Sequence, residues 1–145
     1  MKIFLGSDHG GFELKKRVAE YLKKSKKYEV EDLGCNNTDS CDYPIFGKKV
    51  AEKVVKTKGS KGIVMCGSGV GISMAANKVR GVRCVMANSV ELATLGRAHN
   101  GANVLAMGER TKFIDEPLKI VDAFLNTEED MSERHVRRRG ELNQM

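Results

Sequence analysis

The sequence has no tryptophan and few other aromatic residues, with three tyrosines and five phenylalanines in 145 residues. Proteins that bind single-stranded nucleic acids stack bases on aromatic side chains, so this scarcity argues against that class. The net charge is +6, but the basic residues gather at 23–27 and 134–139, without a zinc-finger, RNP or basic-zipper pattern. We therefore expect no nucleic-acid partner.

Long apolar runs are also missing, because none approaches the ~18 residues of a transmembrane helix. The four cysteines have neither C-x-x-C spacing nor paired histidines, which argues against a zinc site and a disulfide framework. Residues 1–6 carry one lysine among apolar residues, and Asp8 soon follows, as in a first strand rather than a secretory leader. We expect a cytoplasmic protein without a membrane segment, in a reducing compartment.

What the sequence does contain is an alternation of strand-like and helix-like segments within one domain, 1–145. Five apolar segments are predicted as strands, at 2–7, 28–33, 63–65, 82–87 and 103–107. A segment with helical spacing follows each strand, at 12–22, 44–55, 72–78, 90–98 and 114–125. This alternation predicts an α/β fold in three layers, with a doubly wound parallel sheet of five strands.

The most informative stretch is 61–78, where Gly67, Gly69 and Gly71 stand between a predicted strand and a predicted helix. Glycines let the chain turn tightly and let a ligand approach the backbone. The helix start leaves N–H groups unpaired and carries a partial positive charge, so it favours an anion. Cys66 ends the strand at the same place, and a helix N-terminus favours the thiolate form of a cysteine. Cys66 is therefore a candidate base or nucleophile.

Plainer interpretations of this stretch stay open. A G-x-G-x-G sequence is a weak signal by itself, and cysteine is often only a small buried hydrophobe. The dinucleotide fingerprint G-x-G-x-x-G does not fit, because Ala75 comes one place too late, and no P-loop sequence occurs. Neither a nicotinamide cofactor nor ATP is predicted.

Other polar residues fall near the ends of predicted strands. In a doubly wound sheet, ligands bind beyond the carboxyl ends of the strands. Asp8 and His9 follow the first strand, and Arg110 follows the fifth. His99 and Asn100 instead precede the fifth strand, so topology does not guarantee them a place at the same edge.

Residues 128–145 are predicted as a basic tail. Arg134 and Arg138 are four residues apart, which places them on one face if this segment is helical. The planar guanidinium fork recognises phosphate, so the tail could contribute to a phosphate site. The alternative is a solvated basic tail, which charge runs usually are.

Several motifs occur in the order found in a known family. They are Ser-Asp-His-Gly-Gly at 7–11, Asp-Tyr-Pro at 42–44, the stretch 66–78, Arg-Ala-His-Asn at 97–100, Asn-Val-Leu-Ala at 103–106, and Arg134-His135. With them the chain resembles the ribose-5-phosphate isomerase type B family, which includes the galactose-6-phosphate isomerase subunits. The resemblance implies a Rossmann-like fold, a homodimer or dimer of dimers with shared active sites, and an isomerase that uses no metal and no cofactor. The implied reaction interconverts D-ribose 5-phosphate and D-ribulose 5-phosphate through a cis-enediolate, in the non-oxidative pentose phosphate pathway.

The resemblance also implies roles for individual residues. Cys66 matches the base that moves a proton between C2 and C1, Ser68 a supporting hydroxyl, and His99 the residue that helps to open the furanose ring. The implied substrate-binding residues are Asp8, His9, Gly67, Ser68, Gly69, Val70, Gly71 and Asn100, and the implied phosphate-binding residues are His9, Arg110, Arg134 and Arg138. Because the family's site lies between subunits, we expect His99, Asn100 and Arg110 to serve the neighbouring chain. Tyr43, beside Asp42, is a candidate wall of the site.

The chain departs from the family pattern in small ways. Ser68 stands where many relatives have threonine, and it keeps the hydroxyl. Ile72 stands where relatives without the cysteine carry a glutamate base, which places this chain in the cysteine branch. Among the three arginines at 137–139, the spacing from Arg134 favours Arg138. Three other functions stay open: a hexose-phosphate isomerase acting on galactose 6-phosphate or allose 6-phosphate, a non-catalytic sugar-phosphate sensor, and an FMN-binding protein.

Overall fold

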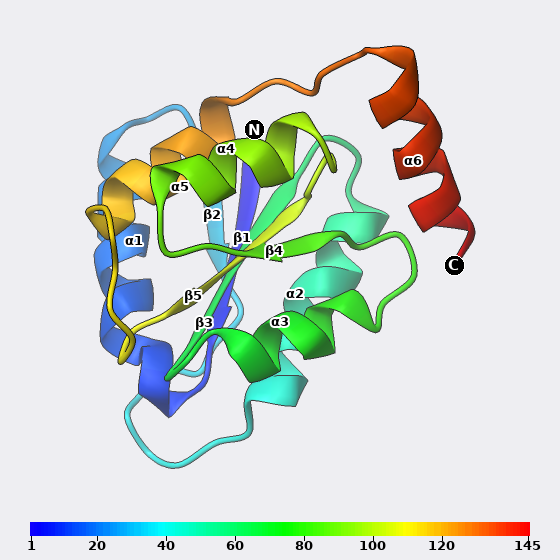
Figure 1. The fold of residues 1–145 in the computed structure, drawn as a ribbon. Helices are drawn as coiled ribbons and strands as arrows, with labels where there is room; N and C mark the ends of the chain where they lie inside the picture. The colour runs from blue at the N-terminus through cyan, green and yellow to red at the C-terminus, as the bar shows by residue number, and fades with distance from the viewer.

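The computed structural model describes all 145 residues, Met1 to Met145. Its central element is a sheet of five parallel strands in the order β2-β1-β3-β5-β4 (Figure 1). The strands are β1 (Lys2–Ser7), β2 (Glu29–Asp32), β3 (Lys61–Cys66), β4 (Cys84–Met86) and β5 (Val104–Gly108). The predicted five-stranded parallel sheet is confirmed.

Helices cover both faces of the sheet (Figure 1). One face carries α1 (Phe12–Lys24), α4 (Val90–Ala98) and α5 (Pro117–Asn126), and the other carries α2 (Tyr43–Lys56) and α3 (Val70–Asn77). Side chains alternate along β3, so Ile63 and Met65 pack toward the first group, while Val64 and Cys66 pack toward the second. These two apolar layers confirm the predicted three-layer, Rossmann-like sandwich.

Local sequence explains where several helices form. In α1, Leu14, Val18 and Leu22 recur at four-residue spacing and are buried against the sheet. Helix α5 begins at Pro117 rather than at 114 as predicted, because proline suits the first turn of a helix and is disfavoured later in it. Ile114 is consequently left outside the helix, 72% exposed.

The connections create a crevice at one edge of the sheet. The chain leaves β1 toward α1 on one face and leaves β3 toward α3 on the other face. Adjacent parallel strands whose helices lie on opposite faces open a gap beyond their carboxyl ends, where ligands of doubly wound folds bind. Any ligand site built by this sheet is therefore expected beside Ser7 and Cys66.

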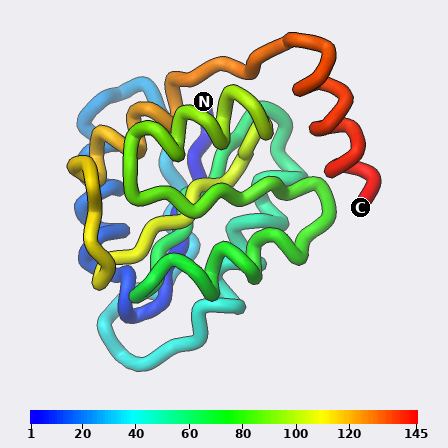
Figure 2. The backbone as a smooth tube through the Cα atoms, viewed as in Figure 1, coloured from blue at the N-terminus to red at the C-terminus, as the bar shows by residue number.

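The predicted basic tail is a helix over most of its length, α6 (Glu133–Gln144). Figures 1 and 2 show it at the margin of the molecule, reached by an extended segment after α5. Only His135 and Arg139 of this helix are buried, while Val136 and Leu142 are exposed. No helix of the chain combines the length and the apolar character needed to cross a membrane.

Candidate active site

Cys66 is the last residue of β3 and is buried at the base of the glycine loop. Its sulfur accepts a hydrogen bond from the Gly69 N–H at 3.1 Å, which stabilises negative charge on the sulfur. Gly69 has a φ of +80°, and a Cβ there would lie 2.9 Å from the backbone nitrogen of Gly108, so only glycine lets the loop pass β5 this closely. The N–H groups of Gly67 and Ser68 have no partner in the chain. The stretch thus has the strand, glycine turn and helix that the sequence predicts.

Asp8 lies directly beside this loop, at the end of β1. Its Oδ1 accepts a hydrogen bond from the Gly11 N–H at 3.1 Å and caps a short 3-10 turn, η1 (His9–Gly11). A Cβ on Gly10 would lie 3.0 Å from the backbone nitrogen of Gly67, so the turn packs directly on the glycine loop. Asp8 is only 7% exposed, yet its second oxygen receives no hydrogen bond within the chain. This oxygen can accept a hydrogen bond from a ligand hydroxyl.

His9 is oriented by the loop between β2 and α2. His9 Nδ1 lies 3.2 Å from the N–H of Cys41 and 3.2 Å from its carbonyl oxygen, so it accepts from the former or donates to the latter according to the tautomer. The main chain of Cys41 therefore holds the ring. Nε2 can donate a hydrogen bond to an anion when it carries a proton.

Two further predicted residues border the same loop. A Cβ on Gly67 would lie 3.5 Å from Arg110 Cδ and 3.9 Å from its Nη1, so the exposed guanidinium lies beside the loop of its own chain. This placement favours a role for Arg110 at the site of its own chain, whereas from the sequence we expect it to serve the neighbouring chain. A Cβ on Gly71 would lie 2.6 Å from the Tyr43 ring, so this ring covers the start of α3. Tyr43 thus lies where a wall of the site would be.

His99 and Asn100 lie at the opposite end of the sheet. They follow α4, just before the amino end of β5, where the Asn103 carbonyl accepts from the Gly62 N–H at 2.9 Å. Cys66 is at the far end of the six-residue β3, and a rise of ~3.3 Å per residue separates the two ends by about 16 Å. One chain therefore does not bring His99 to its own Cys66.

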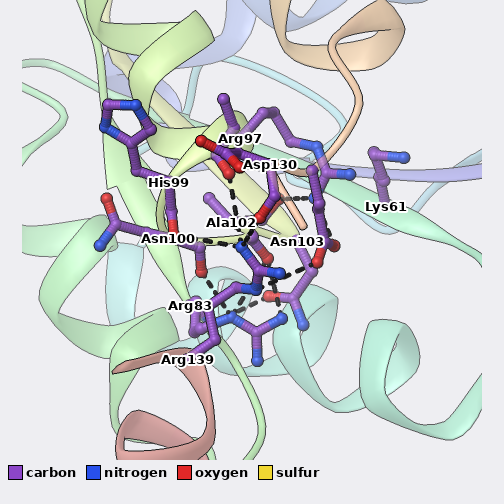
Figure 3. Close-up of polar contacts among 12 residues, drawn as sticks. Lys61, Arg83, Arg97, His99, Asn100, Ala102, Asn103, Asp130 and Arg139 are labelled. Atoms are coloured by element: carbon purple, nitrogen blue, oxygen red, sulfur yellow. Dashed lines mark hydrogen bonds and ion pairs between the residues drawn. The ribbon is translucent and has the colours of Figure 1, made fainter. Parts of the chain in front are cut away.

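Three buried or half-buried arginines, Arg83, Arg97 and Arg139, hold the end of α4 (Figure 3). They donate to the carbonyl groups of residues 98–102 at 2.7 to 3.4 Å. The Ala98 carbonyl belongs to the last turn of α4, where carbonyls lack intrahelical partners, and the other carbonyls follow the helix. In Figure 3 the side chains of His99 and Asn100 point away from this cluster. These three arginines, which we call the clamp, therefore fix the backbone and leave the side chains of His99 and Asn100 directed outward.

Helix α6 brings two predicted arginines to the same region. The His135 ring stacks on the His99 ring, with centroids 4.3 Å apart and planes 8° from parallel. Arg134 and Arg138 are exposed and form no ion pair in the chain. Arg137 instead pairs with Glu141 at 3.8 Å, and Arg139 is buried in the clamp. Arg134 and Arg138 are thus the arginines left to meet an outside anion, as their spacing suggests.

Sequence reasoning missed the supporting groups. The main chain of Cys41 orients His9, and no side-chain pattern signals such a bond. Arg97 does stand inside the Arg-Ala-His-Asn motif, but the motif does not show whether this arginine holds the backbone or contacts a ligand. Burial raises the pKa of Cys41 to about 11 and that of Cys84 to about 12, so both stay protonated thiols near neutrality.

Comparisons with known proteins point to one family. The model of the ribose/galactose isomerase family matches residues 3–142. Ribose-5-phosphate isomerase B of Mycobacterium tuberculosis is 45% identical over 139 residues, covering 95% of this chain and 85% of that protein. A ribose-5-phosphate isomerase B structure from Clostridium thermocellum superposes with a TM-score of 0.94 and 48% identity, covering 99% of this chain and 96% of the other. That from Mycoplasma genitalium, with bound ribulose-5-phosphate, has a TM-score of 0.91 and 44% identity, covering 99% and 94%. The chain therefore belongs to the ribose/galactose isomerase family.

Proposed function

We propose that this protein is an aldose–ketose isomerase that interconverts D-ribose 5-phosphate and D-ribulose 5-phosphate. The observation that carries the proposal is the placement of Cys66 at the base of the glycine loop, with an N–H donor 3.1 Å from its sulfur. The relatives named ribose-5-phosphate isomerase B and the related structure that holds ribulose-5-phosphate support the choice of substrate. A cytoplasmic location fits this small-molecule chemistry.

In the proposed reaction, Cys66 takes the proton from C2 of the open-chain sugar and returns it to C1. The transfer passes through a cis-enediolate, which carries negative charge on O1 and O2. The unpartnered N–H groups of Gly67 and Ser68 can donate to that charge as it develops. The Ser68 hydroxyl accepts from the Val70 N–H at 3.2 Å, which leaves its own hydrogen free to donate to the substrate. Each such donor contributes roughly 2.7–4 kcal/mol to transition-state stabilisation in other enzymes.

The phosphate is proposed to lie away from the reacting carbons, between His9 and Arg110 of one chain and Arg134 and Arg138 of another. The charge-assisted hydrogen bonds of guanidinium groups suit a phosphate. Binding at this remote group orients the reacting end of the sugar and lowers the entropic cost of the reaction. The Tyr43 ring and the free oxygen of Asp8 would border the sugar between the phosphate and Cys66.

The site is completed by a second copy of the chain. His99 opens the furanose by acid–base catalysis at the ring oxygen and O1, and histidine is the side chain suited to this near neutrality. Because about 16 Å of β3 separates His99 from Cys66 of the same chain, the His99 that serves a given Cys66 belongs to a partner. A two-fold homodimer, alone or within a dimer of dimers, then has two sites, each with residues from both chains.

A direct test is an isomerase assay of the purified protein on ribose 5-phosphate, with allose 6-phosphate and galactose 6-phosphate beside it. We expect the pentose to be turned over fastest, with or without EDTA. Cys66→Ala should lower kcat by about 100-fold or more, because a general base is lost, while the protein still binds ribose 5-phosphate. Cys84→Ala is the matched control, and it should retain activity. Wild-type turnover by Cys66→Ala would refute the assignment of the base.

The family description also covers galactose isomerases, so a six-carbon sugar phosphate is the second candidate substrate. The same assay separates the two. Turnover of a hexose phosphate alone would keep the mechanism and change the substrate. No turnover of any of the three sugars would indicate a binding protein instead.

A further inference from the structure

A second group of chemically reactive side chains lies around His99, away from Cys66. It consists of His99, Asp130 and His135, which come from the end of α4, the segment before α6 and α6 itself. One nitrogen of each histidine and one carboxylate oxygen lie within 4.8 Å of one another. The reaction proposed above uses only His99 of these three, so the presence of the other two needs a separate explanation.

His135 supplies the strongest sign that this group suits a ligand. The residue is 94% buried, since only 6% of its surface is exposed, and its Nε2 has no hydrogen-bond partner. A buried polar atom without a partner is costly, and such atoms in native structures often mark the place of an ion or water. A neutral imidazole nitrogen is the commonest metal ligand in proteins.

Asp130 faces this nitrogen with one free oxygen. Its Oδ1 accepts from the Ser132 N–H at 2.8 Å, while its Oδ2 lies 3.5 Å from His135 Nε2. Ligands about 2.0–2.1 Å from a tetrahedral ion are separated by roughly 3.3 Å from each other, close to the observed 3.5 Å.

The backbone around the three side chains is held in place. The Asp130 N–H donates to the Ala98 carbonyl at 2.8 Å, which ties the segment before α6 to the end of α4. Arg139 donates to the Asp130 carbonyl at 2.9 Å and to the His99 carbonyl at 3.4 Å. Two of the three ligands are therefore preorganised relative to one another, with Asp130 oriented by an outer hydrogen bond, as in established metal sites.

His99 is the ligand that must move. Its ring is stacked 8° from parallel on His135, so the nitrogen lone pairs of the two rings point in parallel directions rather than toward one point. His99 is half-buried and its ring makes no hydrogen bond in the chain, so rotation about its side-chain torsions can turn one nitrogen toward Asp130. Metal binding therefore requires the stack to open and the His99 ring to leave its outward position.

The surrounding charges restrict which ion fits. The guanidiniums of Arg97 and Arg139 are nearby, but both pair with Glu129, at 3.5 and 3.3 Å. Arg134 and Arg138 add exposed positive charge, which opposes any cation. A hard ion such as Mg²⁺ or Ca²⁺ prefers several oxygen ligands and would find only one carboxylate here. Imidazole nitrogens instead favour zinc, copper and nickel, whose bonds to nitrogen are stronger.

We propose that His99, Asp130 and His135 form a binding site for a divalent metal ion such as zinc, copper or nickel, and that an ion bound there inhibits the enzyme. Inhibition follows because the ion occupies a His99 nitrogen that would otherwise open the sugar ring. The inhibition rests on the function proposed above, whereas metal binding does not. The site would thus be a point of metal control in an enzyme whose chemistry itself needs no metal.

The binding arm uses the full-length protein, stripped with EDTA and titrated with Zn²⁺ in a calorimeter. Both arms compare wild type with Asp130→Asn, which keeps the acceptor for Ser132, and with Glu128→Gln, a matched loss of one exposed carboxylate two residues away. Loss of an outer-shell partner alone weakens metal affinity by about 10–100-fold, so loss of a ligand in Asp130→Asn should weaken it at least tenfold. Glu128→Gln should bind as wild type does. His99→Asn, a change at a half-buried position, should also bind at least tenfold more weakly, and it serves as the second variant if Asp130→Asn folds poorly.

The activity arm measures isomerisation while Zn²⁺ is raised and then removed with EDTA. Wild type should lose activity and recover it, and Asp130→Asn should keep its basal activity and need at least tenfold more Zn²⁺ for half-inhibition. Equal Zn²⁺ affinity in wild type, Asp130→Asn and His99→Asn would overturn the proposed site. Zn²⁺ inhibition that persists unchanged in Asp130→Asn would overturn the proposed inhibition through this site. It would indicate that Zn²⁺ inhibits by binding the Cys66 thiol instead. If Zn²⁺ binds as expected but the protein turns over no sugar phosphate, only the proposed function is refuted.

Discussion

The separation of His99 from Cys66 within one chain predicts that two inactive variants restore each other. Cys66→Ala removes the proposed base, and His99→Asn removes the proposed ring-opening residue. Each homodimer alone should lose about 100-fold or more of its activity, because each of its sites lacks one acid–base group. A dimer that contains one chain of each kind differs, because one of its two sites combines the intact Cys66 of one chain with the intact His99 of the other.

The size of the recovery follows from the geometry. About 16 Å of β3 lies between the two residues of one chain, so each proposed site takes them from different chains. Random pairing of equal amounts makes about half of the dimers mixed, and each mixed dimer has one intact site of two. The mixture should therefore show about a quarter of wild-type activity, and purified mixed dimers about half. A dimer of dimers also gives about a quarter in the mixture, but its doubly tagged tetramers should show only about two sevenths, because they also contain unmixed dimers.

The assay is co-expression of the two variants with different affinity tags, two successive purifications, and isomerase measurement on ribose 5-phosphate. Co-expressed chains that both carry Cys66→Ala are the control, and they should stay inactive. If both residues of a site came from one chain, the mixed dimer would contain no intact site and would show no recovery. That result would refute the shared site and the reasoning from the sheet.

Three further predictions concern single residues. Arg138→Ala should raise KM for ribose 5-phosphate by roughly 10–100-fold with a smaller change in kcat, because a charge-assisted hydrogen bond to phosphate is lost. The control is Arg137→Ala, because the Arg137 guanidinium pairs with a glutamate on the same helix. Equal KM values for the two variants would mean that α6 is a solvated helix with no role in phosphate binding. Gly71→Ala places a Cβ 2.6 Å from the Tyr43 ring and must displace it, so kcat/KM should fall by roughly 10–100-fold, whereas an unchanged value would remove Tyr43 from the site wall. The pKa of Tyr21 is raised from 10.0 to about 12, mainly by its hydrogen bond to a carboxylate. This hydrogen bond therefore stabilises the fold fully below pH 10, and the stabilisation is lost as the pH rises to about 12. Tyr21→Phe should therefore be less stable than wild type in urea below pH 10, with a difference that shrinks toward pH 12; a constant difference would contradict the assignment.

Much of this protein can be predicted from sequence because its signals are local. Strand and helix periods alternate along the chain, and each helix that follows a strand must pack on the sheet that the strand joins. The loop at 67–71 is similarly local, since a positive φ at Gly69 and the start of α3 are set by neighbouring residues. The match of the ribose/galactose isomerase family model to residues 3–142 confirms the family that the motifs suggest.

Boundaries and partners were harder to predict because they depend on distant residues. Strand β4 has only the three residues Cys84–Met86, although the largely apolar segment 82–87 is predicted as a strand of six residues. Arg110 belongs with its own chain's glycine loop because β5 lies next to β3, a neighbour relation that no local pattern records. The basic segment after 128 becomes a helix because His135 and Arg139 find partners at the end of α4.

The sequence by itself thus determined the order of strands and helices, the family, and the candidate residues for the chemistry, because each of these is encoded in short motifs. Only the tertiary structure decided which of those residues meet. It gathers Asp8, His9, Cys66 and Arg110 at one end of the sheet and places His99 with α6 at the other end. The physical reason is that parallel strands put all their carboxyl ends at one edge, while the helix that leads into β5 must end at the opposite edge.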